Sequence, residues 1–272
     1  MTTVSNPKIS SLLRFLTFVE VVVLFLAGCG IFFLPKVVTP FWPWAVAPFN
    51  ASFLGAVYAA AMIAAVMQTA YARWSPTRIV TPMIFIFTLI IILLSFVHLS
   101  QFDFQRPEVW IWFLLYIILP INAGVHIYLY RQLPPADATP PSGFGKNLLL
   151  VQGIILGVYG IALLAIPSTA ASIWPWKIDV FHAQLYSVTF LTPALGALLL
   201  VKAASKIEWL SMGLTQCVLG LFPLIGLFVV DASAKRISWD SAGTWIWITL
   251  FSAIFIIGLW MLGQAQRSKN NI

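Results

Sequence analysis

Charged side chains are scarce in this chain. Asp, Glu, Lys and Arg make up 8% of its 272 residues, against about 25% in soluble domains. Hydrophobic residues make up 61%, which is more than a soluble chain of this length can cover with polar surface. The net charge of +7 does not indicate nucleic-acid binding, because the basic residues are scattered singly at the ends of apolar runs. The composition therefore excludes an ordinary soluble domain and favours a protein whose solvent is the lipid bilayer.

Cysteines and catalytic motifs are scarce as well. Cys29 and Cys217 lie within apolar runs and predict no disulfide framework. The sequence has no HExxH, GxSxG, CxxC or phosphate-binding loop, so we predict a protein that is not an enzyme and has no metal or cofactor. An enzyme acting on a lipid inside the helix bundle stays open. The histidines do not predict a haem, because His98 and His126 fall near opposite sides of the membrane.

Eight apolar runs are long enough to cross the hydrocarbon core, which takes about 20 residues in a helix. They are continuous rather than alternating, which favours helices over a β-barrel. The stretch LAGC, residues 26–29, matches a lipoprotein cleavage box, but Glu20 interrupts the run before it and the apolar GIFFLP follows, so we keep the first span. The predicted spans are residues 12–34, 51–73, 79–100, 109–130, 148–167, 183–204, 207–230 and 244–265.

Lysine and arginine near the ends of the spans predict the orientation, because cytoplasmic connections carry more of them. With a cytoplasmic N-terminus, ten lie on the cytoplasmic side and five on the other. The predicted location is therefore the cell membrane, with multiple crossings and both termini in the cytoplasm. The ten are Lys8, Arg14, Arg73, Arg78, Arg131, Lys146, Lys202, Lys206, Arg267 and Lys269, and the five are Lys36, Arg106, Lys177, Lys235 and Arg236.

The sequence WPW occurs twice, 132 residues apart. The same offset relates further pairs, and shared identity at a fixed offset is typical of an internal duplication. Four spans per copy is an even number, so both copies enter the membrane from the same side, as in parallel-repeat transporters. We predict an all-α integral membrane protein of eight transmembrane helices in two tandem parallel four-helix repeats, residues 1–131 and 148–272, joined by a Pro/Gly-rich linker, residues 132–147. The further pairs are Gly28 and Gly160, Pro35 and Pro167, Phe49 and Phe181, Ala51 and Ala183, and Glu20 and Gln152.

Each WPW motif falls between the first and second spans of its copy. Indole rings favour the headgroup level of a bilayer, where the ring is buried and the N–H stays wet. The motifs are thus interpreted as interfacial anchors that cap the bundle, and a ligand-facing aromatic lid is the alternative. The interfacial aromatic motif consists of Trp42, Pro43, Trp44, Trp174, Pro175 and Trp176.

The stretches FWPWAVAPFNASFLGAVYAA and IWPWKIDVFHAQLYSVTFLTPALGA carry a resemblance. They are similar to a motif of uncharacterised bacterial polytopic membrane proteins with a repeated W-P-W loop. That family often has a basic residue soon after WPW, whereas Ser52 and Gln184 stand nearby here. The resemblance implies a polytopic membrane fold and no particular activity.

Polar residues within the spans are the candidate functional residues, because such groups are costly in lipid. Counting residues from the ends of their spans places Asn122 at a depth similar to that of Glu20 and His126 nearer the surface, with Gln152 and Gln216 again in the cytoplasmic half. In one interpretation this intramembrane polar layer holds helices together by hydrogen bonds, with Glu20 protonated or paired with His126. In the other, Glu20 and His126 exchange protons coupled to the movement of a solute. The layer consists of Glu20, Asn122, His126, Gln152 and Gln216.

Two functions follow from these features. The first is a non-enzymatic scaffold, assembly or sensor subunit, and the alternative is a small-solute transporter or channel with its site between the two repeats. The expected partners are membrane lipid and another membrane protein, and not nucleic acid.

Overall fold

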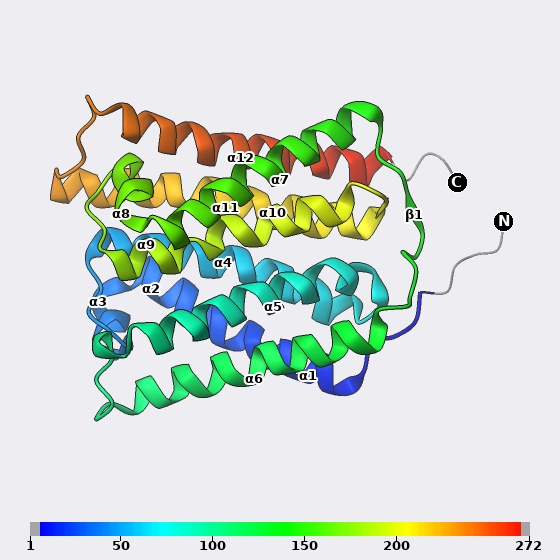
Figure 1. The fold of residues 1–272 in the computed structure, drawn as a ribbon, viewed down its shortest axis with the longest axis horizontal. Helices are drawn as coiled ribbons and strands as arrows, with labels where there is room; N and C mark the ends of the chain where they lie inside the picture. The colour runs from blue at the N-terminus through cyan, green and yellow to red at the C-terminus, as the bar shows by residue number, and fades with distance from the viewer. Residues whose placement is uncertain (1–5, 268–272) are drawn as a thin grey trace.

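The protein is an almost entirely helical, multi-pass membrane protein, which confirms the predicted class of an α-helical membrane protein with eight spans. The computed structural model describes residues 6–267, so Lys269 of the predicted cytoplasmic set lies outside the described residues. Eight helical segments are long and apolar enough to cross a membrane. Residues 6 and 267 lie at the same end of the bundle (Figure 1), which we call the terminal end, and the WPW motifs lie at the opposite end, which we call the WPW end. The spans are Ser11–Phe33, Pro48–Tyr71, Trp74–Val97, Pro107–Tyr130, Gly143–Ala165, Val180–Leu200, Lys206–Ala234 and Ala242–Arg267.

Short helices at the WPW end join the spans of the first half. The first span consists of α1 (Ser11–Leu24), the π-helical segment η1 (Phe25–Cys29) and α2 (Gly30–Phe33). A π-helical turn is rare and is often found at functional sites. The remaining elements of this half are α3 (Pro35–Val38), η2 (Thr39–Phe41), α4 (Pro48–Tyr71), α5 (Trp74–Val97), η3 (Leu99–Gln101) and α6 (Pro107–Tyr130).

The second half has the same order of spans as the first, but its first span is a single α-helix without a π-helical turn. Its second span is divided into α9 and α10, and residues 235–241 between its last two spans form no 3₁₀-helix. Its elements are α7 (Gly143–Ala165), α8 (Pro167–Ala170), η4 (Ala171–Ile173), α9 (Val180–Tyr186), α10 (Val188–Leu200), α11 (Lys206–Ala234) and α12 (Ala242–Arg267). Two short strands, β1 (Ala138–Thr139) and β2 (Ala204–Ser205), pair antiparallel at the terminal end.

Local backbone geometry recurs in the two halves at the offset of 132 residues. Ser10 and Ser142 both cap the helix that follows, each accepting a hydrogen bond from the backbone N–H three residues on. The first helix of each half stops at Leu34 or Ile166, with φ/ψ of −129°/52° and −133°/56°. These matches support the duplication, which stays a prediction.

The helices α4 and α10 lie at the centre of the bundle (Figure 1). Helix α4 packs against α1 of its own half and α11 of the other half, and α10 packs against α7 of its own half and α5 of the other. The second span of each half therefore packs against the third span of the other half. Small residues such as Ala51, Ala56 and Ala60 are buried on α4 and allow this close approach.

An ion pair fastens the two halves at the terminal end. The Arg78 guanidinium donates to both carboxylate oxygens of Glu208 at 2.8 and 2.9 Å, and to the carbonyl oxygen of Ala203 at 2.8 Å. Glu208 is fully buried and also accepts from the backbone N–H of Ser205, at the start of α11. Helix α5 begins at Trp74, five residues before the predicted 79, and the ion pair allows the charged Arg78 to lie within this span. A charge within a span looks like a boundary in sequence, but Arg78 has a partner.

The predicted linker, residues 132–147, is only partly non-helical. Helix α7 begins at Gly143, so residues 143–147 belong to the fifth span. The physical reason is the cap, since the Ser142 hydroxyl accepts from the backbone N–H of Gly145 at 3.1 Å. The two glycines at the start of this helix are not enough to prevent its formation once the end is capped.

Gly220 lies where α11 packs against α12. A Cβ atom there would clash with the backbone nitrogen of Phe255 and would lie 2.7 Å from the carbonyl oxygen of Phe251. We expect Gly220→Ala to force the helices apart and lower the free energy of unfolding by about 1–3 kcal/mol, measured as a lower midpoint of thermal unfolding in detergent. Gly263→Ala is the control, because its Cβ would meet open space. Equal midpoints for the two variants would contradict the prediction.

Candidate functional site

A cavity of about 420 Å³ lies in the first half of the chain. It is bounded by α1, η1, α3, α4, α5 and α6, and α10 and α11 of the second half close one wall. Small-molecule sites have volumes of about 300–1,000 Å³. Several residues that line it, namely Leu26, Val37, Phe41 and Ile111, are also exposed on the outside of the bundle. The cavity therefore opens sideways, on the surface that a membrane protein turns toward lipid.

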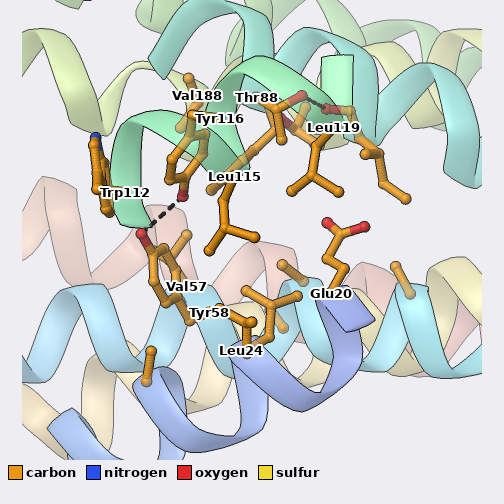
Figure 2. Close-up of a pocket in the computed structure, with 18 of the residues that line it drawn as sticks. Glu20, Leu24, Val57, Tyr58, Thr88, Trp112, Leu115, Tyr116, Leu119 and Val188 are labelled. Atoms are coloured by element: carbon orange, nitrogen blue, oxygen red, sulfur yellow. Dashed lines mark hydrogen bonds between the residues drawn. The ribbon is translucent and has the colours of Figure 1, made fainter. Parts of the chain in front are cut away.

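Glu20 is an acidic side chain in the lining of this largely apolar space. Its side chain comes from α1, and Figure 2 shows the carboxyl group extending toward Leu119 of α6. The residue is 8% exposed, and within residues 6–267 its Oε2 atom has no hydrogen-bond partner. An unpaired charge in such surroundings costs far more than a neutral group. The carboxyl group is therefore free to bind a partner that enters the cavity.

Aromatic residues form much of the wall. The hydroxyl groups of Tyr58 on α4 and Tyr116 on α6 are 2.8 Å apart and hydrogen-bonded (Figure 2). Trp112 packs against Tyr116 at a ring-centroid distance of 4.3 Å, with the two ring planes tilted by 44°. Two further polar atoms of lining residues, Trp42 Nε1 and Thr192 Oγ1, are buried and without a partner over the described part of the chain. The cavity therefore holds several unused hydrogen-bonding groups from both halves.

A row of buried hydrogen bonds closes the bundle on the terminal side of Glu20. The Gln68 amide on α4 donates to Thr17 Oγ1 on α1 at 2.9 Å and accepts from Thr81 Oγ1 on α5 at 3.0 Å. Thr17 lies one turn before Glu20, and all three side chains are at most 2% exposed. This row, which we call the polar floor, ties α1, α4 and α5 together on the terminal side of Glu20.

The structure separates the predicted polar layer into three groups. Glu20 lines the cavity, Gln152 donates to Gln216 at 2.7 Å in the second half, and Asn122 and His126 lie together on α6. All five residues are buried. Depth alone placed them in one layer, whereas the rotation of each helix about its axis turns them toward different neighbours.

The predicted pairing of Glu20 with His126 is wrong as a direct contact. The His126 ring uses both nitrogens elsewhere, with Nε2 2.6 Å from Ser10 Oγ and Nδ1 2.8 Å from the carbonyl oxygen of Asn122. Ser10 lies just before α1, so it meets the imidazole at the terminal end, and Glu20 lies further along the helix. A proton exchange directly between these two residues has no route in this arrangement.

The tryptophans of the WPW motifs lie inside the bundle. Trp42, Trp44, Trp174 and Trp176 are 4, 3, 6 and 9% exposed, and they pack against one another and against neighbouring aromatic rings. Interfacial anchors would instead show their rings to lipid, as Trp110 does at 60% exposure. The interpretation of the motifs as lipid-facing anchors is therefore not supported by their burial. The two motifs cap the core instead, and Trp42 with Pro43 also lines the cavity.

The second tryptophan of each motif binds the other half of the chain. Trp44 donates from Nε1 to His182 Nε2 at 3.2 Å, and Trp176 donates from Nε1 to Asn50 Oδ1 at 2.8 Å. His182 and Asn50 are themselves 132 residues apart. The two hydrogen bonds are thus reciprocal, as in the self-complementary interface of a twofold dimer. Neither acceptor could be predicted from the sequence, because the two equivalent positions hold different residue types.

The imidazole of His182 links this contact to the surface. Because its Nε2 accepts from an indole N–H, the ring proton must be on Nδ1, and Nδ1 lies 2.9 Å from Asp179 Oδ1. Asp179 also caps α9, accepting from the backbone N–H of His182 at 2.8 Å. These hydrogen bonds hold the pKa of the Asp179 carboxyl below its usual range.

Eight long apolar helices define a polytopic helical membrane protein, and six of these spans line the lateral cavity. Within residues 6–267, no group of three or more His, Cys, Asp or Glu side chains is arranged to hold a metal ion. Comparison of the chain with protein-family models, with curated proteins and with solved structures gives no match. The residues that line the cavity are therefore the basis for a functional proposal.

Proposed function

We propose that the protein is a transporter of a small, largely apolar solute, which binds in the lateral cavity of the first half. The observation that carries the proposal is the buried Glu20 carboxyl without a partner in the lining of this cavity. A scaffold has no need of such a site. Groups of this kind are costly in a membrane and are kept where they bind or move something.

The position of the cavity also favours transport over a purely structural role. Helices of both halves line it, and parallel-repeat transporters place their sites where two repeats meet. It is open toward the lipid-facing surface, which gives a largely apolar solute a way in from the bilayer, and the row of Thr17, Gln68 and Thr81 ties α1, α4 and α5 together on the terminal side of Glu20.

The two halves also differ in the way that a single site would require. The positions equivalent to Glu20 and Tyr58 hold Gln152 and Phe190, and the position equivalent to η1 is ordinary α-helix. Gln152 is already paired with Gln216. The second half therefore supplies a wall and a packing partner, while the first half supplies the binding groups.

The test uses proteoliposomes and three labelled probes that share a hexyl chain: hexyltrimethylammonium, the zwitterionic hexyl sulfobetaine and hexanesulfonate. We expect uptake of at least one probe above that of protein-free liposomes. Leu115→Trp fills the cavity and should abolish this uptake, because Leu115 lines it. Leu114→Trp is the matched control, since Leu114 directly precedes Leu115 on α6 and is exposed on the outside. The absence of uptake for all three probes, or equal loss in both variants, would refute transport through this cavity.

A further inference from the structure

The charge of the cavity points to the kind of solute that it takes. Both charge-bearing side chains that line it are acids: Glu20 on α1 and Glu108 at the WPW end. Over residues 6–267, no lysine, arginine or histidine lines the cavity, and Arg106 is turned to Glu108 at 3.7 Å. An anionic head group would meet no positive partner here. A cation would meet one unpaired carboxyl group.

The aromatic walls favour the same class. Aromatic faces attract organic cations, and cages of such rings are a known way to bind quaternary ammonium groups. The six rings of the lining all come from the first half, from η2 and the residue after it and from α4, α5 and α6. They belong to Phe41, Trp42, Tyr58, Phe87, Trp112 and Tyr116.

We infer that the solute is a lipophilic organic cation, whose positive head pairs with the Glu20 carboxylate while its apolar body lies along the aromatic wall. The inference rests on the proposed function and narrows it to one class of substrate. Over the described residues, Glu108 is the one other charge-bearing side chain of the lining, and Arg106 lies 3.7 Å from it.

Binding of such a cation replaces the proton of the Glu20 carboxyl group with the positive head of the solute. In the empty cavity the carboxyl group is neutral, because a lone buried charge is costly. When the cation binds, the carboxyl O–H bond breaks, the proton leaves to water and the carboxylate pairs with the cation. The other titratable side chains that face this space are Tyr58 on α4, Tyr116 on α6 and Glu108 at the mouth, whereas α5, α10 and α11 present threonines. Protons and the cation therefore compete for Glu20, and affinity should fall as the pH is lowered.

The experiment compares the uptake of the three hexyl probes by proteoliposomes that contain the wild type or Glu20→Gln. We expect the wild type to prefer hexyltrimethylammonium to hexyl sulfobetaine and hexanesulfonate, and Glu20→Gln to weaken its binding by about 30-fold, because the buried charge partner is lost. Glutamine is tolerated at the equivalent position 152, which supports folding of this variant. Asp103→Asn is the control, since Asp103 is exposed and lies outside the cavity.

Glu20→Asp guards against a folding defect, because it keeps the charge on a shorter side chain and should keep the preference for the cation. Equal uptake of all three probes by the wild type, or an unchanged preference in Glu20→Gln, would overturn the inference and leave transport through the cavity standing. Uptake of none of the probes would refute both.

Discussion

Arg78→Ala is expected to lower the free energy of unfolding by about 3–5 kcal/mol, because removing one partner of a buried ion pair leaves the other charge uncompensated. Glu208 is that partner. It is fully buried, and the guanidinium donates to both of its oxygens. The pair also joins α5 of the first half to α11 of the second, so its loss weakens the contact between halves. Thermal unfolding in detergent, followed by the fraction that stays monodisperse, measures the effect.

Arg131→Ala is the matched control for this prediction. Arg131 lies at the same end of the bundle, but it is exposed and contacts only Tyr128 among the described residues. Its removal should cost about 1 kcal/mol or less. The double variant Arg78→Ala/Glu208→Gln should recover part of the loss, because no buried charge is then left alone. If Arg78→Ala and Arg131→Ala unfold at the same temperature, the ion pair does not stabilise the protein.

Trp44→Ala is expected to be about as damaging, with a loss of about 3–5 kcal/mol, because it empties a large volume in the core. Trp44 contacts Trp112, Phe102 and Phe181 with ring-centroid distances of 4.9 to 5.6 Å. The variant also leaves the Nε2 atom of His182 without its donor. Trp176→Ala should cost a similar amount, since it removes the reciprocal bond to Asn50.

Trp110→Ala separates packing from membrane anchoring. Trp110 lies at the same end of the bundle and is 60% exposed, so its removal should cost about 1 kcal/mol or less. The measurement is the unfolding midpoint in detergent and again in lipid nanodiscs. If the WPW tryptophans act as anchors, Trp44→Ala should be harmless in detergent and harmful in nanodiscs. Packing predicts a large loss in both.

The number of spans and their approximate limits could be predicted from sequence, because lipid demands long apolar helices and leaves few alternatives. The exact ends of the spans were harder to predict from the sequence. Arg78 and the glycines at Gly143 and Gly145 looked like boundaries, but a buried carboxylate pairs with the first and a serine cap starts the helix at the second. Such partners lie far away in sequence or depend on a single hydroxyl group.

The site was only partly predictable for a similar reason. Glu20 stood out, because an acid inside a span is rare. The Tyr58–Tyr116 pair and the Gln68 floor did not, because tyrosine and glutamine are common enough within membrane helices to carry no signal alone. Their roles depend on which way each helix is turned about its axis. The sequence does not determine that rotation, because the faces of these helices differ little in hydrophobicity. His126 illustrates the point, since it has a suitable depth and faces Ser10 instead of Glu20.

The reciprocal indole contacts have a consequence for the origin of the chain. Each half donates one hydrogen bond to the other half and accepts one from it, at positions 132 residues apart. A four-span ancestor could therefore make both hydrogen bonds by pairing with a copy of itself. Joining two such copies in one polypeptide fixes their ratio at one to one. If the two halves arose in this way, their fusion would have allowed equivalent positions to diverge. The carboxyl group of Glu20 in one half and the amide of Gln152 in the other are a difference of the kind that such divergence predicts.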